Sequence, residues 1–371
     1  MFSFFLGLFF LFILVISFSN NLMKLFANFH NSKNSIFGSD KYRYGDLYGL
    51  SYLKDFKFEI DENSNNVALI KYNTSAYNLF IAGDSYLGRP FVKSDSIFCG
   101  VNDYWYSNYV RETPPAIKLP DNQRNILVIE TVERNLLTFA DTNVLSHIVV
   151  GNKNKIINKN IPTKLSFNNL YIDLTEKYVY NPGLNENLEY NLFDYRLFTP
   201  LKEFKANLND KVFNRVNNDV VISPDRKYLF YAPTVDTTSW SSAFIKIEDA
   251  DIERIVNSLN VLYKNYREAG FDEVYFSIMP NPVTILSPDI FGKEKYNKII
   301  TRIESNRNLN MPVIDVYELF KHVKMQIYFN SDTHWNANGF RLWVNEFNRR
   351  INEDQNSWES KKNITTLHFP N

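Results

Sequence analysis

The stretch LFIAGDS over residues 79–85 decides the fold class. Its first four residues form a short apolar run, which stops at a Gly-Asp-Ser sequence. Such a run is typical of a buried parallel strand, whose two faces are both apolar. Ser85 then stands at the carboxyl end of the strand, where ligands bind in open parallel sheets. The stretch therefore predicts a parallel sheet with a functional serine at its edge.

Further apolar runs predict the neighbouring strands and the helices between them. The strand candidates are residues 126–129 (ILVI), 274–279 (VYFSIM) and 313–316 (VIDV). Apolar residues recur at helical spacing over residues 250–269, where Gly270 provides a stop, and over residues 339–351. Strands that alternate with helices predict an α/β domain built on a parallel sheet.

A second segment, SDTHWNANG over residues 331–339, supplies the partners that a nucleophilic serine needs. Asp332 and His334 are two positions apart, so in an extended segment they project to the same side. The carboxylate can then bind the Nδ1–H of the imidazole and leave Nε2 to take the proton of Ser85. Asn336 or Asn338 is expected to cap the following helix. These residues predict a Ser-His-Asp catalytic site.

Two other roles for His334 are a metal ligand and a buried structural histidine. The metal role lacks partners, because the other histidines, at positions 30, 147, 322 and 368, show no ligand-like spacing with it. The chain has one cysteine, Cys99, which excludes an intramolecular disulfide and a cysteine-based zinc cluster. We expect neither a metal nor a cofactor.

These segments resemble the SGNH (GDSL-like) hydrolase superfamily. The sequence GDSYLG at 83–88 is similar to its nucleophile block. The sequences DTHWN at 332–336 and VERN at 132–135 are similar to the branch that contains the SGNH domains of alginate O-acetylation proteins. The resemblance implies a flavodoxin-like three-layer α/β/α domain, an acyl-serine intermediate and no cofactor. In that branch the Asp-His block usually precedes the serine, the reverse of the order here, so its polymer cannot be carried over.

The second oxyanion donor has no clear motif in this sequence. The superfamily uses a glycine and an asparagine, and no Gly-x-Asn-Asp block is present. By position, Asn281 after the third strand and Arg134 after the second are the best substitutes, with Glu130 or Glu133 orienting Arg134. The alternatives are an asparagine that only forms a turn and an arginine on the surface or in a salt bridge. Trp335 is either a wall of the substrate pocket or packing beneath the helix.

The N-terminus predicts a membrane anchor. The first 18 residues carry no charge, and as a helix they would span about 27 Å. The first charged residue is Lys24, and neither a basic n-region nor a good cleavage site is present. We expect residues 1–20 to form an uncleaved signal anchor with the catalytic domain exported. A cleaved signal peptide and a buried helix are the alternatives.

The rest of the chain divides by composition. We expect a linker over residues 21–74, an SGNH-like domain over 75–352 and a tail over 353–371. Residues 150–245 are rich in Asn, Tyr and Phe, show no long periodic helix and predict an irregular insertion that caps the active face. The formal net charge is zero and the isoelectric point is about 7.0, which argues against a nucleic-acid partner.

Taken with the resemblance, these features predict a membrane-anchored serine O-acyltransferase that acetylates an exported polysaccharide or surface glycan. Its partners would be an acyl donor and a glycan acceptor, and the resemblance also implies a membrane-bound O-acyltransferase that supplies the donor. One alternative is a carbohydrate acetylesterase of the same fold. Another is a catalytically weak scaffold that binds glycans.

Overall fold

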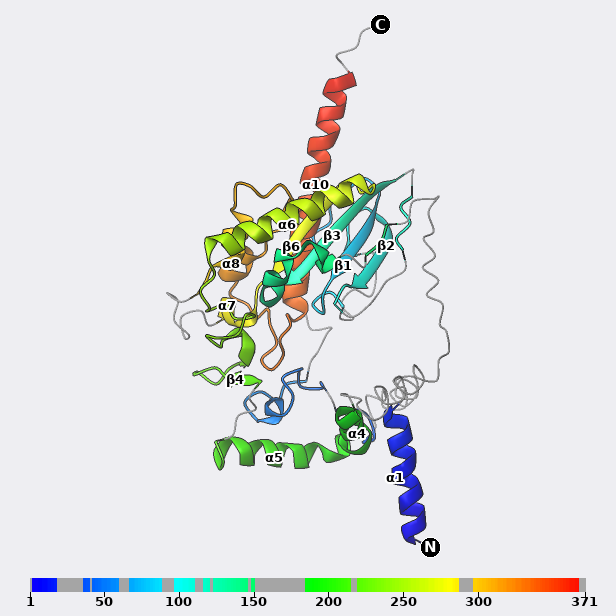
Figure 1. Cartoon of the computed structure of the whole chain (residues 1–371), viewed down its shortest axis with the longest axis vertical. Coiled ribbons are helices and arrows are strands. Elements are labelled where there is room, and N and C mark those ends of the chain that lie inside the picture. The colour runs from blue at the N-terminus through cyan, green and yellow to red at the C-terminus, as the bar shows by residue number, and fades with distance from the viewer. Residues whose placement is uncertain are drawn as a thin grey trace, which may run out of the picture. The chain divides into compact units, whose positions relative to one another are not determined.

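The chain forms two compact units. Unit 1 comprises Met1–Ile60 and Ile157–Asn217, and unit 2 comprises Asp61–Ile156 and Asn218–Asn371. Figure 1 shows the elements of both units. The computed structural model describes residues 2–18, 36–40, 42–59, 67–88, 97–110, 116–120, 123–145, 148–150, 184–214, 219–286 and 296–366.

Unit 2 is built on a four-stranded sheet in the order β2-β1-β3-β6, in which every pair is parallel. The strands are β1 (Tyr77–Gly83), β2 (Val101–Asn108), β3 (Arg124–Val132) and β6 (Glu273–Met279). Ala82 lies beside Ile129, and Val132 lies beside Met279. The carboxyl ends of β1, β3 and β6 therefore meet at one edge, which confirms the α/β class with a parallel sheet.

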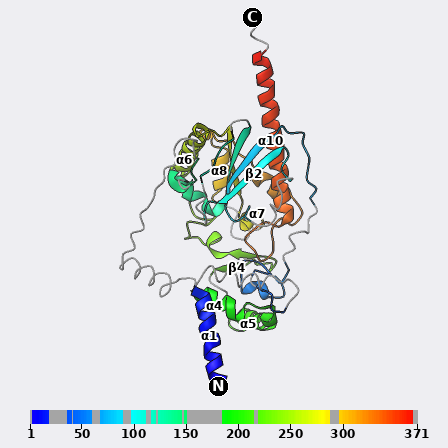
Figure 2. The same ribbon diagram turned by 90° about the vertical axis from the view of Figure 1, so that its right-hand side faces the viewer.

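Helices cover both faces of this sheet, because successive side chains of a strand point to opposite sides. Phe80 packs with Leu127 and the apolar side of α6 (Asp249–Glu268) in one core. Leu79 and Ile81 pack in a second core with α10 (Ala337–Thr366). Figures 1 and 2 show the strands between α6 and α10. The smaller helices α8 (Ile299–Glu304) and α9 (Tyr317–His322) add to the two cores.

Two details of the predicted sheet were wrong. Residues 313–316 form no strand of their own: Val313 makes one parallel bridge to Phe276 of β6. Asp315 instead accepts the N–H of Tyr317 and starts α9. Strand β2 was not predicted, because its sequence VNDYWYSN is polar and aromatic rather than continuously apolar.

The helix boundaries follow from local capping. A capping box between Glu248 and Asp251 begins α6, and Gly270, at φ +114°, follows its end. Oδ1 of Asn336 accepts the N–H groups of Asn338 and Gly339, so Asn336 caps α10 as expected. The remaining elements of unit 2 are η3 (Glu133–Ala140), η4 (Thr142–Leu145), β4 (Val220–Ile222), β5 (Leu229–Tyr231), η7 (Ala232–Thr234) and α7 (Pro282–Leu286).

Unit 1 is helical in its described residues. It contains α1 (Phe2–Phe18), η1 (Leu50–Tyr52), α4 (Leu184–Phe193), η6 (Arg196–Phe198) and α5 (Thr199–Lys211). The 13-residue α5 corrects the expectation that residues 150–245 hold no long periodic helix. Of that predicted insertion, residues 151–183 and 215–218 lie outside the described residues.

Buried charges hold α5 to the rest of unit 1. Nζ of Lys202 lies 2.9 Å from Oδ1 of Asp194 and 3.4 Å from Oδ2 of Asp40. Thr199 Oγ1 donates to the same Asp40 oxygen at 2.9 Å. Both carboxyl groups are almost fully buried, so each depends on these partners. Residues 42–59, expected to be part of a linker, add the buried ring of Tyr52 to this core.

The predicted anchor forms α1, which ends at Phe18 and is 17 residues long. Of the helices in the described part of the chain, none combines the length and the apolar character needed to cross a membrane. The predicted transmembrane helix is therefore not found.

Candidate active site

The serine turn follows β1 and is shaped by Gly83. A Cβ at this position would lie 2.8 Å from Oε2 of Glu130 and 3.2 Å from the ring of Tyr106, so a larger residue would displace that buried carboxyl. The same Oε2 accepts the N–H of Asp84 at 2.9 Å. Among the described residues no acceptor binds the N–H of Ser85, which leaves this donor available at the carboxyl edge of the sheet.

Asp84 joins the serine turn to the neighbouring strand. Its Oδ1 accepts the N–H of Tyr86 at 2.9 Å, and its Oδ2 accepts the N–H of Val132, the last residue of β3, at 2.8 Å. The hydroxyl of Tyr106, in β2, donates to the carbonyl oxygen of Asp84 at 2.7 Å. Three strands therefore fix the backbone that carries Ser85.

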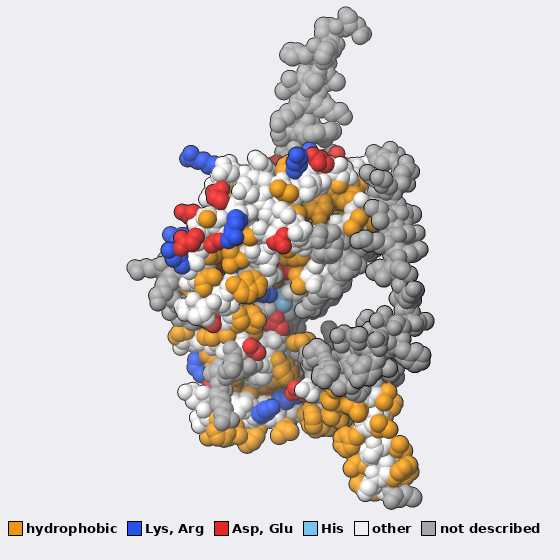
Figure 3. Space-filling view, viewed as in Figure 1, with side chains coloured by type: hydrophobic (Ala, Val, Ile, Leu, Met, Phe, Trp, Pro, Cys, Tyr) orange, Lys and Arg blue, Asp and Glu red, His pale blue; other side chains and the backbone are white. Residues whose placement is uncertain are grey.

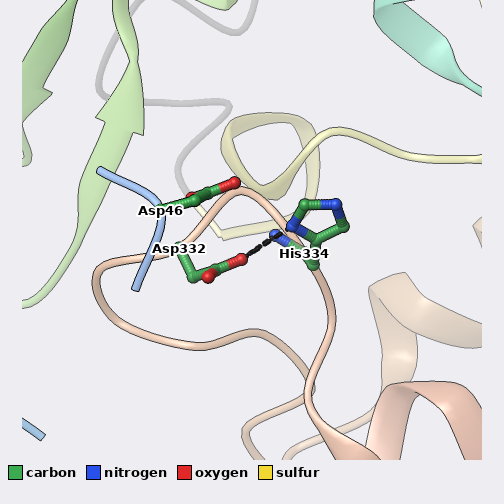
Figure 4. A group of neighbouring side chains, drawn as sticks. All are labelled: Asp46, Asp332 and His334. Atoms are coloured by element: carbon green, nitrogen blue, oxygen red, sulfur yellow. Dashed lines mark hydrogen bonds and ion pairs between the residues drawn. The ribbon is translucent and has the colours of Figure 1, made fainter. Parts of the chain in front are cut away.

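The structure brings together the three residues of the predicted triad. Nε2 of His334 lies 2.8 Å from Oγ of Ser85, and Nδ1 of His334 lies 2.8 Å from Oδ1 of Asp332. Figure 4 shows that Asp332 and His334 come from one loop and are hydrogen-bonded. Asp332 is fully buried, so its carboxylate is held by hydrogen bonds rather than by water. This is the arrangement of a nucleophile, a base and a group that orients the base.

Both ring nitrogens of His334 are therefore engaged by protein groups. This geometry suits transfer of a proton between Ser85 and His334.

Tyr86 fastens the histidine loop to the serine turn. Its hydroxyl donates to the carbonyl oxygen of Thr333, and its own carbonyl oxygen accepts the indole N–H of Trp335 at 3.2 Å. Trp335 is fully buried and packs against Phe320, Phe340 and Trp343 in the core beneath α10. This placement matches the packing role that the sequence left open for Trp335.

Asn281 lies directly after β6, at the same edge of the sheet. Its side chain is fully buried, yet neither Nδ2 nor Oδ1 has a hydrogen-bond partner among the described residues. Buried amides in native proteins are nearly always paired, so an unpaired one calls for a functional explanation. Its backbone N–H donates to Oε2 of Glu133 at 2.8 Å, which fixes the position of the residue.

Glu133 is buried beneath this turn. Its Oε2 also accepts the hydroxyl of Thr284 at 2.7 Å. Burial raises the pKa of Glu133 from 4.5 to about 7, while its bonds from Thr284 and Asn281 act in the opposite direction. The side chain thus couples the start of η3 to the start of α7.

Arg134 lies against the residue next to the nucleophile. Its guanidinium carbon is 5.8 Å from the centre of the Tyr86 ring, and its Nη1 is buried without a partner among the described residues. We expected Glu130 or Glu133 to orient it. In the described part of the chain neither forms an ion pair with Arg134, although the positive charge of Arg134 acts on the buried Glu130. The Tyr86 ring provides a further contact.

Glu130 is a residue that the sequence did not mark for the serine turn. It is fully buried in β3, and burial together with the nearby charge of Asp84 raises its pKa well above the usual value. The sequence likewise indicated Asp84 and Tyr86 only as members of the GDSYLG motif at residues 83–88. Their bonds join segments far apart in the chain, and no pattern along the sequence indicates them.

Part of the predicted insertion reaches the histidine loop. In unit 2 the β4–β5 hairpin binds Asn330, two residues before Asp332. The N–H of Leu229 donates to the carbonyl oxygen of Asn330 at 2.7 Å, and Nδ2 of Asn330 donates to the carbonyl oxygen of Lys227 at 2.8 Å. This hairpin therefore binds the chain just before Asp332, whereas Tyr86 binds it at Thr333, just after Asp332.

Comparisons with protein-family models, with curated proteins and with solved structures found no match to this chain.

Proposed function

We propose that the chain is a serine acyl-transfer enzyme of the SGNH type. Ser85 is its nucleophile, His334 its general base and Asp332 the group that orients the base. The observation that carries the proposal is the continuous hydrogen-bonded relay from Oγ of Ser85 through His334 to Asp332, with both distances at 2.8 Å. A relay of this kind makes a serine hydroxyl nucleophilic at neutral pH.

The topology supports the same family. The order β2-β1-β3-β6, continued by the bridge at Val313, corresponds to the 2-1-3-4-5 order of flavodoxin-like sheets. In such sheets ligands bind where the strand order reverses, beyond the carboxyl ends of the first and third strands. Ser85 follows β1 and Arg134 follows β3, so both stand at this point.

The first half-reaction forms an acyl-serine. Nε2 of His334 takes the proton from Ser85 as Oγ bonds to the acyl carbon, and the carbonyl electrons move onto oxygen. The N–H of Ser85 and Nδ2 of Asn281 are the donors that we assign to this oxyanion, since neither has a hydrogen-bond partner among the described residues. When the intermediate collapses, the alcohol of the donor ester leaves with the proton from His334.

The second half-reaction returns the enzyme to its starting state. An acceptor hydroxyl gives its proton to Nε2 of His334 and attacks the acyl carbon. The bond to Ser85 then breaks, and the serine regains the proton. A glycan hydroxyl as acceptor makes the protein a transferase, and water makes it an esterase.

We favour an O-acetyltransferase that acts on an exported polysaccharide or surface glycan. The support is the resemblance of the histidine block to the alginate O-acetylation branch, together with the uncharged N-terminal helix. On this account the donor is supplied by a membrane-bound O-acyltransferase partner. A carbohydrate acetylesterase is the second candidate, and it uses the same relay.

Acetate release from p-nitrophenyl acetate tests the proposal, with and without added oligosaccharides. The full chain should hydrolyse the ester, Ser85→Ala should lose this activity, and Ser305→Ala, at an exposed serine, should keep it. An acetylated oligosaccharide detected by mass spectrometry identifies the transferase. Acetate release to water that no acceptor changes identifies the esterase.

A serine-reactive fluorophosphonate probe tests the scaffold alternative. Labelling that disappears in Ser85→Ala supports an enzyme. Folded wild-type protein that takes up no label, and hydrolyses no faster than Ser85→Ala, would make the chain a non-catalytic scaffold.

A further inference from the structure

Helix α5 and the residue that follows it carry a largely exposed apolar stripe, formed by Leu201, Phe204, Leu208 and Val212. These residues are separated by three, four and four positions, which is the spacing that places side chains along one face of a helix. Leu201, Phe204 and Val212 are exposed and Leu208 is half-buried. A row of large apolar side chains in water is unusual on a soluble surface and marks a site of interaction.

The other face of α5 is already used. Ala206 is buried, and Lys202 and Thr199 bind the buried carboxyl groups of Asp40 and Asp194. The helix therefore cannot rotate to bury its stripe without breaking these bonds. The stripe faces outward because the fold of unit 1 requires it.

Exposed lysines flank the stripe. At about 100° per residue, Lys205 lies on one side of the stripe and Lys211 on the other. Long lysine side chains let an apolar helix face enter lipid while the ammonium groups stay at the level of the phosphates. This charge arrangement suits a lipid surface on which the helix lies flat.

A second apolar surface belongs to the same unit. Helix α1 has no charged residue, and its exposed side chains include Phe4, Phe9 and Phe12. Its last turn is fixed to α4, since Ser17 accepts hydrogen bonds from Asn187 at 2.9 Å and from Asn191 at 2.8 Å. Figures 1 and 2 show α1 extending away from α4 and α5, and Figure 3 shows hydrophobic side chains along the side of α5 that faces in this direction.

We infer that unit 1 is a lipid-binding module in which the apolar stripe of α5 lies in the membrane–water interface beside α1. The stripe enters the boundary between headgroups and acyl chains, and the flanking lysines bind phosphates. This contact needs no helix that crosses the bilayer, and it does not depend on the chemistry at Ser85.

A fluorophore on the stripe tests the inference in the full chain. An environment-sensitive dye is attached to Phe204→Cys and, as a matched control on another side of α5, to Asn209→Cys. The native Cys99 is buried. Any reaction of the dye with Cys99 is measured in the parent chain, which carries no added cysteine. Vesicles of phosphatidylcholine, with and without phosphatidylserine, should shift the emission of the dye at position 204 to the blue. Lipids with brominated tails should quench the dye at 204 more than the dye at 209.

A second variant measures how much the stripe contributes to binding. Replacing Leu201, Phe204 and Val212 by serine should lower vesicle partitioning about tenfold or more, with no loss of thermal stability because all three residues are exposed. Unchanged emission at position 204 on vesicles, or equal partitioning of the triple variant, would overturn the inference. A stripe that is silent on lipid and shifts only with added membrane protein would likewise overturn it and indicate a protein partner.

Discussion

The described residues around Ser85 include both hydrogen-bonded supporting groups and buried polar atoms without a partner. The relay occupies both nitrogens of His334, and Asp84 binds two backbone N–H groups. Among the described residues, Nη1 of Arg134, the backbone N–H of Ser85 and the amide of Asn281 have no partner. The last two are the donors that we propose for the oxyanion.

Replacing Asn281 is predicted to affect catalysis and not stability. Asn281→Ala should lower kcat about 10²–10³-fold with little change in KM, because the lost bond forms in the transition state. Stability should fall little, since the amide has no hydrogen bond to lose within the described part of the chain. The matched control is Asn348→Ala. Asn348 is also buried, but it binds the N–H of Cys99 and the carbonyl oxygen of Ile97.

Steady-state kinetics and thermal melts distinguish the two variants. Asn348→Ala should lose stability and keep kcat. If Asn281→Ala instead loses stability and keeps kcat, Asn281 is a structural residue and the second oxyanion donor lies elsewhere.

Glu133 gives a prediction for pH. Its pKa is about 7 when folded against 4.5 in its ordinary state, so between these pH values the folded chain keeps a proton that the unfolded chain has lost. The free energy of unfolding therefore falls as pH rises through this window, by on the order of 3 kcal/mol from this residue. Glu133→Gln should remove that part of the slope, whereas Glu268→Gln, at an exposed residue, should leave it.

Urea unfolding at a series of pH values measures the slope. The comparison between wild type and variant isolates Glu133, because the other buried carboxyl groups are common to both. Identical slopes in wild type and Glu133→Gln would mean that the folded protein carries an ionised Glu133 throughout this window.

Whether an element could be predicted from the sequence depends on how the element is buried in the fold. Strands β1, β3 and β6 could be predicted because they are buried on both faces and read as continuous apolar runs. Strand β2 lies at the edge of the sheet, and its exposed Asn102 and Asp103 break that pattern. The triad could be located because Asp332 and His334 share one loop and Ser85 ends a strand. The bonds from Tyr86 and Glu130 could not, because they join segments that only the folded chain brings together.

Helix α5 was missed for a related reason. Its apolar residues do recur at helical spacing, but they face outward while a lysine and an alanine face the core. A core helix is predicted where apolar residues point inward, and in α5 they do not. The outward position of these apolar residues is what identifies this surface as a binding face.

The start of α10 gives a prediction for packing. A Cβ at Gly339 would lie 2.6 Å from the backbone oxygen of Ile327 and 2.8 Å from Cβ of Trp335. Gly339→Ala should therefore displace the loop that carries His334, lower stability by about 1–3 kcal/mol and reduce kcat. The control is Gly7→Ala, because a Cβ at Gly7 meets no atom within 4 Å. Full activity and stability in Gly339→Ala would show that this loop does not depend on the close approach.

At the scale of the whole molecule, the two units have separate means of stabilisation. Unit 2 has two apolar cores on either side of a sheet. The described part of unit 1 relies on a buried ion cluster around Lys202. The candidate catalytic residues all lie in unit 2, and the exposed apolar helices α1 and α5 lie in unit 1. Chemistry and lipid attachment are therefore assigned to different parts of the chain.

This division predicts a local effect of Lys202→Met. The substitution leaves Asp40 and Asp194 buried without their cation, which should cost about 3–5 kcal/mol in unit 1. Hydrogen exchange should show lost protection in α5, while the amides of β1 and β3 stay protected and ester hydrolysis is unchanged. Equal loss of protection in both units would show that they unfold together.

The proposed mechanism requires that Ser85 becomes acylated with His334 as its base. The most direct measurement is mass spectrometry of the intact protein and its peptides after brief reaction with p-nitrophenyl acetate and quenching in acid. We predict an added acetyl group on the peptide that contains Ser85, and none on Ser85→Ala or His334→Ala. Acetyl groups scattered over lysines at equal levels in all three proteins, with none on Ser85, would contradict the account.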